Sequence, residues 1–179
     1  MSIRLIYEQM LAGALGGWIG QDLALRAAPA GPTLLAGALI GGSVGFLANV
    51  PVARRLAPSE AARALAVGAA AGGVAGAIGF GFPFGLLAIP NFAGVLIGGV
   101  SVGLATGLAR WPGPIGLRAG LLGGLLGGMS MAAITAARLH PESVGASCLG
   151  ALIGLALALP GSIPANSTTA PIRGAGATR

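Results

Sequence analysis

The chain has 179 residues, of which 55% are hydrophobic and only 8% are charged. Soluble domains of this size carry roughly a quarter charged residues, and a soluble core could not hide this much apolar surface, which excludes a water-soluble globular fold. The composition therefore predicts an integral membrane protein. Every basic residue is an arginine, and the arginines lie between apolar runs. This placement favours a role in membrane topology over a nucleic-acid interface.

Charges, prolines and glycines divide the chain into six apolar segments, each long enough to cross about 30 Å of hydrocarbon at 1.5 Å per residue. Ser59 and Asn91 are candidate N-caps of the third and fourth segments, and Pro141 suits the first turn of the sixth. The sequence predicts an all-α integral membrane bundle of about six transmembrane helices. In chain order, the predicted helices cover residues 4–26, 33–54, 60–82, 91–110, 115–138 and 141–160.

The arginines are distributed unevenly about these six crossings. The side that holds both termini contains Arg4, Arg54, Arg55, Arg63, Arg110, Arg118, Arg173 and Arg179. The opposite side contains only Arg26 and Arg138. Because positive loops stay in the cytoplasm, this bias predicts cytoplasmic termini in a multipass protein of the bacterial inner (cell) membrane. It also favours an even number of crossings.

Small residues recur at four-residue spacing in every predicted helix, which places them in one row along the helix. The rows comprise Gly16 and Gly20; Gly37, Gly41 and Gly45; Gly68, Gly72 and Gly76; Gly99, Gly103 and Gly107; Gly116, Gly120, Gly124 and Gly128; and Gly150 and Gly154. In lipid, helices associate through close van der Waals contact, and glycine lets two backbones approach. We interpret the rows as helix-packing seams. The alternative is that small residues line a narrow pore or a ligand cleft.

The segments also resemble one another. Residues 36–49 (AGALIGGSVGFLAN) are similar to residues 93–107 (AGVLIGGVSVGLATG), and residues 12–20 are similar to residues 68–76. These matches pair the first helical hairpin with the second, and the last two segments would form a more divergent third copy. Two explanations stay open: repeated helical hairpins, or a low-complexity sequence rich in alanine, glycine and leucine that mimics homology.

Few residues could carry chemistry. Glu8 and Asp22 are the deepest acidic residues and would share a similar face of one helix, so they are candidates for an ion or proton path. The competing interpretation is two interfacial ion pairs at i, i+4 spacing, with Arg4 and with Arg26. The hydroxyl groups within the helices are expected to hydrogen-bond across helices or back to their own backbone.

Metal and enzyme chemistry are not expected. His140 is the single histidine of the chain, and only Glu142 lies beside it, which is too few ligands for a metal site. A lone histidine in a loop cannot complete a nucleophile–base pair, and no glycine-rich loop ends in Lys-Ser or Lys-Thr. We therefore expect a protein that is not an enzyme and that has no cofactor and no metal.

Two segments lie outside the regular helices. The connection at residues 80–92 (FGFPFGLLAIPNF) has no charge and is as apolar as the helices, which makes it the best candidate for a partner surface. Its candidate contact residues are Phe82, Phe84, Leu86, Leu87 and Phe92. The polar tail at residues 161–179, rich in proline, serine, threonine and glycine, is expected to be disordered by itself.

The repeated segments of the form LxGALxGGxxG resemble the glycine-zipper membrane regions of bacterial multipass proteins, some of which carry forkhead-associated or von Willebrand domains. The likeness covers residues 10–158, and no such soluble domain occurs in this chain. A four-helix mitochondrial import-type family is a fainter likeness, and the six crossings argue against it. Neither resemblance supplies a catalytic residue.

The sequence thus supports two expectations of function. The first is a non-enzymatic membrane scaffold or accessory subunit that packs in the lipid bilayer against other membrane subunits or copies of itself, without nucleic acid. The alternative is a channel or transporter for a small solute or ion, with Glu8, Asp22 and the hydroxyl groups lining its path.

Overall fold

The computed structural model describes residues 3–27, 34–81, 91–137 and 142–159. All regular structure in these ranges is helical, which confirms the all-α prediction. The elements are α1 (Ile3–Ala27), α2 (Leu34–Leu47), α3 (Val50–Ala53), α4 (Pro58–Gly76), the π-helix η1 (Ala77–Gly81), α6 (Asn91–Arg110), α7 (Pro114–Ala136) and α8 (Glu142–Ala158).

Four helical stretches are long and apolar enough to cross a membrane: Leu34–Ala53, Pro58–Gly81, Phe92–Arg110 and Pro114–Ala136. They span 19 to 24 residues, which at 1.5 Å per residue corresponds to the thickness of a bilayer core. The chain is thus a plausible multipass membrane protein. α1 is long but carries charged and amide side chains, and the apolar part of α8 is shorter.

Proline sets two helix boundaries that differ from the predicted ones. The predicted helix 33–54 is interrupted, because Pro51 lacks an N–H and its ring clashes with the carbonyl of Leu47, where α2 ends. The side-chain amide of Asn49 donates to the Gly45 carbonyl at 2.7 Å across this break. The prediction that Ser59 is the N-cap of α4 is wrong. The N-cap is Ala57, and Pro58 occupies the first turn.

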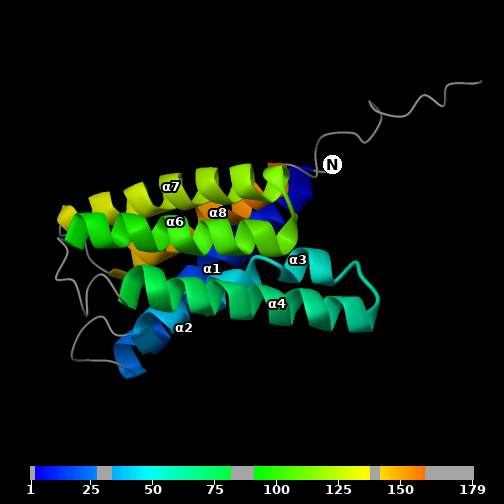
Figure 1. The fold of residues 1–179 in the computed structure, drawn as a ribbon, viewed down its shortest axis with the longest axis horizontal. Coiled ribbons are helices and arrows are strands. Elements are labelled where there is room, and N and C mark those ends of the chain that lie inside the picture. Colours follow the sequence, from blue (N-terminus) through cyan, green and yellow to red (C-terminus); the bar gives the residue numbers. More distant parts are fainter. Residues whose placement is uncertain (1–2, 28–33, 82–90, 138–141, 160–179) are drawn as a thin grey trace, which may run out of the picture.

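The helices form a closed ring. Along the chain, α1 packs on α2, α2 on α4, α4 on α6, α6 on α7 and α7 on α8, and α8 returns to pack on α1. Figure 1 shows the helices lying roughly along one long axis, with α3 at the end where α1 begins. Each long helix therefore contacts one neighbour on either side, and one of its faces points to the centre of the ring.

Side chains fill this space. One buried cluster joins the helices around the ring, and its members include Ile40 and Val44 of α2, Val102 of α6, and Leu149 and Ile153 of α8. Val44, Val102, Leu149 and Ile153 are fully buried, so the centre of the described bundle is an aliphatic core. The outer surface is also apolar, as in a protein that faces lipid.

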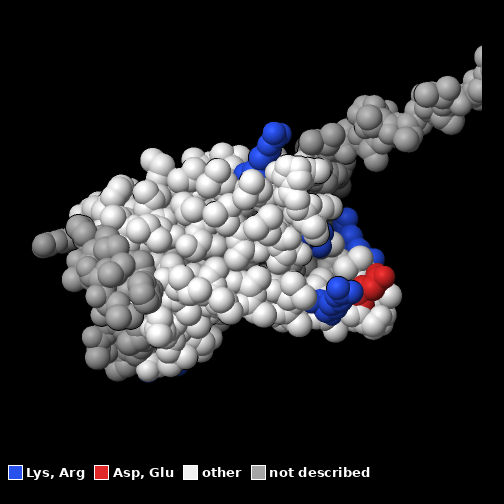
Figure 2. All heavy atoms as spheres, in the orientation of Figure 1, with Lys and Arg blue, Asp and Glu red and all other residues white. Residues whose placement is uncertain are grey.

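Charged residues collect at the end of the bundle where α1 begins (Figure 2). The helix bounds place the following residues at this end: Arg4 and Glu8 of α1, Arg54 and Arg55 after α3, Glu60 and Arg63 of α4, Arg110 of α6 and Arg118 of α7. The last turns of α1, with Asp22 and Arg26, lie at the opposite end. The described sides between these ends are almost free of charge (Figure 2).

Trp111 joins two helices at the arginine-rich end. Its indole N–H donates to the Leu157 carbonyl of α8 at 3.3 Å, and the Arg110 guanidinium lies 5.1 Å from its ring centroid. Since Trp111 directly follows α6, the contact fixes the α6–α7 turn against α8.

We expect Trp111→Phe to lower the free energy of unfolding by about 1 kcal/mol. The substitution removes the indole N–H that donates to the Leu157 carbonyl but keeps an aromatic ring at this position. Thermal unfolding in detergent, followed by circular dichroism, measures the change. Trp18→Phe is the matched control, since Trp18 is 53% exposed and should change stability by less than about 0.5 kcal/mol. Equal effects of the two substitutions would contradict the anchoring role.

Candidate functional site

The glycine rows lie at contacts between helices of the same chain. Between α2 and α4, three pairs are reciprocal: a Cβ atom added at either member would overlap the carbonyl of the other. These pairs are Gly37 with Gly76, Gly41 with Gly72, and Gly45 with Gly68. The residue numbers rise on one helix as they fall on the other, so the two helices are antiparallel and their backbones touch.

Two further helix pairs show the same kind of contact. Between α6 and α7, Gly103 lies against Gly120 and Gly124, and Gly107 lies against Gly116 and Gly120. Gly99 lies against Gly128, where an added Cβ would come within 2.6 Å of the Gly128 Cα. Between α8 and α1, Gly150 faces Gly13, and Gly154 faces the Gln9 carbonyl. This last contact joins the two ends of the described chain.

The contacts between α1 and α2, and between α7 and α8, place glycine against larger residues. Added Cβ atoms at Gly16 and Gly20 of α1 would lie 2.9 Å from the Val44 Cα and 2.7 Å from the Ile40 Cα. On α7, Gly123 and Gly127 face Ile153 and Leu149 of α8 in the same way. Here one helix supplies a flat surface and the other supplies the side chains that enter the core.

Adjacent glycines serve two neighbours at once, because successive residues on a helix are turned by about 100°. Gly16 faces α2 while Gly17 faces α8. On α7, Gly124 faces α6 while Gly123 faces α8. The doubled glycines in GGWIG and GGLLGG are the sequence signal for this second row, which includes Gly17 of α1 and Gly123 and Gly127 of α7.

The contact between α4 and α6 is different. At one end it is close: an added Cβ at Gly79 of η1 would lie 2.7 Å from the Ser101 Cβ, and the buried Phe80 ring covers Gly98. Further along α4, Ala71 and Ala75 stand where α1 and α7 carry glycine, three residues after the row that faces the preceding helix. The two helices separate there.

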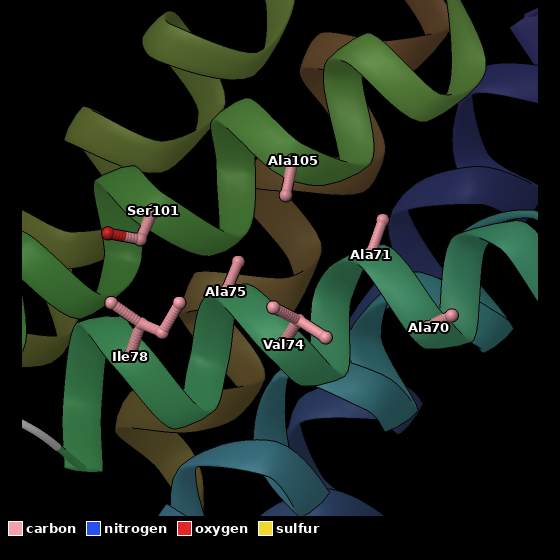
Figure 3. A pocket seen from close by; sticks show the side chains of 7 residues that line it. All are labelled: Ala70, Ala71, Val74, Ala75, Ile78, Ser101 and Ala105. Carbon is pink, nitrogen blue, oxygen red and sulfur yellow. The ribbon is translucent and has the colours of Figure 1, made fainter.

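A groove of about 610 Å³ opens between them, lined by Ala70, Ala71, Val74, Ala75 and Ile78 of the α4–η1 helix and by Ser101 and Ala105 of α6. Figure 3 shows Ala71 and Ala75 pointing toward α6 and Ala105 pointing back toward α4. Val74 and Ile78 are 63% and 60% exposed, so the groove opens on the outer surface of the ring. Its lining offers one polar group, the Ser101 hydroxyl.

The predicted ion-path residues lie in ion pairs at opposite ends of α1. Arg4 Nε is 2.8 Å from Glu8 Oε1, and Arg26 Nε is 2.9 Å from Asp22 Oδ2. Arg55, from the turn after α3, adds a third contact at 3.7 Å from Glu8. The two carboxylates are partly exposed and about 21 Å apart along the helix at 1.5 Å per residue, and the structure does not bring them together.

Hydroxyl groups inside the helices bond mostly to their own backbone. Thr106, Ser130, Thr135 and Ser147 each donate to the carbonyl four residues earlier, at 2.7 to 2.9 Å. These four hydroxyl groups are therefore bonded within their own helices. Gln9 is the polar residue that sequence reasoning overlooked: it is 2% exposed, and within the described ranges its Oε1 accepts no hydrogen bond.

Most of the remaining predicted site residues fall outside the residues that the structure describes. Phe82, Phe84, Leu86, Leu87 and His140 fall outside the described residues. Phe92, at the start of α6, is 53% exposed. Among the residues that the structure describes, no group of three or more histidine, cysteine, aspartate or glutamate residues could hold a metal ion.

Comparison of the chain with known protein families, with curated proteins and with solved structures gave no match.

We expect Gly41→Ala to destabilise the protein by about 1–3 kcal/mol, because its methyl group would overlap the Gly72 carbonyl in a contact that cannot widen without moving α4. Unfolding in detergent measures this loss. The neighbouring Gly42→Ala is the control: its nearest contact is 3.5 Å, so stability should stay the same or rise by up to about 1 kcal/mol, because alanine favours the helix. If both variants were as stable as the wild type, backbone contact between α2 and α4 would not limit stability.

Proposed function

We propose that this protein is a non-enzymatic membrane scaffold or accessory subunit, in which glycine rows pack six transmembrane helices into a closed ring. The observation that carries the proposal is the combination of an aliphatic core with backbone contacts around the ring. Val102, Leu149 and Ile153 occupy the centre, and five of the helix contacts place glycine at their closest points. Such a bundle presents a rigid apolar surface and little chemistry.

Six crossings require α1 and α8 to span the bilayer beside the four apolar stretches. Their place in the ring supports this. α1 packs on the apolar helix α2, α8 packs on the apolar helix α7, and α1 and α8 pack on each other. The charged residues of α1 lie within its first two and last two turns, and the stretch from Gln9 to Gln21 between them has no charge. Long arginine side chains near helix ends can reach the interface.

We also propose that the ring consists of three repeated hairpins, α1–α2, α4–α6 and α7–α8. The contacts between successive hairpins, α2–α4, α6–α7 and α8–α1, are those in which glycine faces glycine. Within hairpins, Gly16 and Gly20 correspond to Gly123 and Gly127. Gly17 faces the preceding helix α8, and Gly72 faces the preceding helix α2, so Gly72 corresponds to Gly17 by its place in the ring. The sequence match instead aligns Gly72 with Gly16, one residue away.

The arginine-rich end would face the cytoplasm of a bacterial cell. Its described residues Arg54, Arg55, Arg63, Arg110 and Arg118 make it more positive than the end that holds Arg26. Positive loops are retained on the cytoplasmic side, so α1 would begin there.

A channel or transporter is the weaker proposal. It would need Glu8 and Asp22 along a continuous polar path, but their carboxylates pair with arginines at the two ends of α1. The buried cluster at the centre of the bundle is apolar, and the buried polar side chains, Gln9, Gln21, Asn49 and Thr106, come from separate helices or from the two ends of α1. These features favour the scaffold.

The test is purification in mild detergent followed by reconstitution into liposomes. We expect stoichiometric membrane subunits or further copies of the chain to co-purify, and we expect no ion or solute flux above that of empty liposomes. Glu8→Gln and Asp22→Asn should leave that baseline unchanged. Flux that these substitutions abolish would contradict the scaffold and establish a transport path.

A further inference from the structure

Measured along α6, the α4–α6 groove lies in the half of the bundle near the arginine-rich end. The α4–η1 helix extends beyond α6 at that end (Figure 1), so the lining residues Ala70 to Ile78 lie in its second half. The α6 residues of the groove, Ser101 and Ala105, stand at the middle of α6 and toward the Arg110 end. Arg110 is nine residues beyond Ser101, which is about 14 Å at 1.5 Å per residue. This length matches one half of a hydrocarbon core about 30 Å thick. The groove therefore spans one leaflet, from its interface toward the bilayer centre.

An arginine stands above the groove on the same helix face. Arg63, Val67, Ala70, Val74 and Ile78 follow one another at spacings of four, three, four and four residues, which places them in one row along α4 and η1. All five are exposed. Arg63 is seven residues, about 10 Å, from Ala70. The row thus begins with a cation and continues as an apolar track into the groove.

Arg63 forms no ion pair among the residues that the structure describes, although Glu60 stands three residues earlier on the same helix. Glu8 pairs with Arg4 and Arg55, and Asp22 pairs with Arg26 at the other end. Other exposed arginines at this end, such as Arg118 of α7, do not lie on the helices that line the groove. The apolar groove therefore ends beside an exposed guanidinium that is available to bind an anion.

We propose that the α4–α6 groove binds an anionic phospholipid of the arginine-side leaflet, with its phosphate at Arg63 and one acyl chain along Val67 and Val74 to Ile78. The lining of methyl groups suits a hydrocarbon chain, and the guanidinium suits a phosphate oxygen. Charge complementarity between the exposed Arg63 guanidinium and a phosphate favours a lipid as the occupant. The site goes beyond the scaffold proposal, since it requires only insertion in a membrane.

The experiment measures phosphatidylglycerol binding to the purified full-length chain in a phosphatidylcholine–detergent background by native mass spectrometry. Arg63→Gln should weaken binding roughly fivefold, which corresponds to about 1 kcal/mol for one arginine at a membrane surface. Arg118→Gln removes an exposed arginine at the same end and should leave the affinity unchanged. Equal losses in both variants would show general surface charge and would overturn the site.

A second pair of variants tests the groove itself. Ala75→Leu fills the space between α4 and α6, so it should lower phosphatidylglycerol binding at least as much as Arg63→Gln. Ala133→Leu adds the same volume to an exposed position on α7 and should bind as the wild type does. Circular dichroism checks that both variants fold. Unchanged binding by a folded Ala75→Leu protein would overturn the proposal.

The competing occupant is tested by cross-linking. With Cys148→Ala as background, Ile78→Cys should stay monomeric on oxidation in phosphatidylglycerol-containing membranes, because lipid covers the groove. If the Cys148→Ala, Ile78→Cys protein formed disulfide dimers efficiently and retained no phosphatidylglycerol, the groove would belong to a second copy and the lipid would be rejected.

Discussion

Backbone contact between antiparallel helices is the interaction on which the rest of this structure depends. At Gly41 and Gly72, or at Gly13 and Gly150, an added methyl group would overlap a carbonyl of the neighbouring helix. Helices in lipid gain little from moving leucine side chains out of acyl chains, so close contact must supply much of their association. Because glycines take the shared faces, the larger side chains are left to fill the ring centre or to cover its outside.

The same constraint bears on the α4–α6 contact, where the ring is open at the groove. Ala71 and Ala75 line the open part of the α4–α6 contact, while Gly79 and Gly98 lie in the close contact at the η1 end, where Phe80 is buried. The groove therefore opens where alanine stands in a row that carries glycine in the other hairpins. Its outward opening directs it to lipid, and the row that continues to Arg63 gives it a polar end. The proposed lipid site and the proposed scaffold thus arise from one packing rule and its exception.

Much of the fold followed from local signals. Hydrophobic length, proline and charge were sufficient to predict an all-helical chain, and the i, i+4 pairs of α1 were anticipated as one of two alternatives. The interruption before Pro51 was not, although the clash with the carbonyl four residues earlier is local. The candidate site was missed, because a groove depends on the distance between two helices. Nothing along α4 alone distinguishes Ala71 and Ala75 from the many other alanines that face lipid or pack closely.

By itself, the sequence determined the environment and the rows: its apolar composition requires a membrane-like surrounding, and four-residue spacing aligns glycines along each helix. Only the tertiary structure decided which row meets which. Spacing defines a face of one helix but not the neighbour that this face meets, so Gly16 and Gly17 could be assigned to α2 and α8 only once the ring was known. The closure of α8 on α1 joins residues more than a hundred positions apart, such as Gly13 and Gly150, and no local pattern encodes that distance.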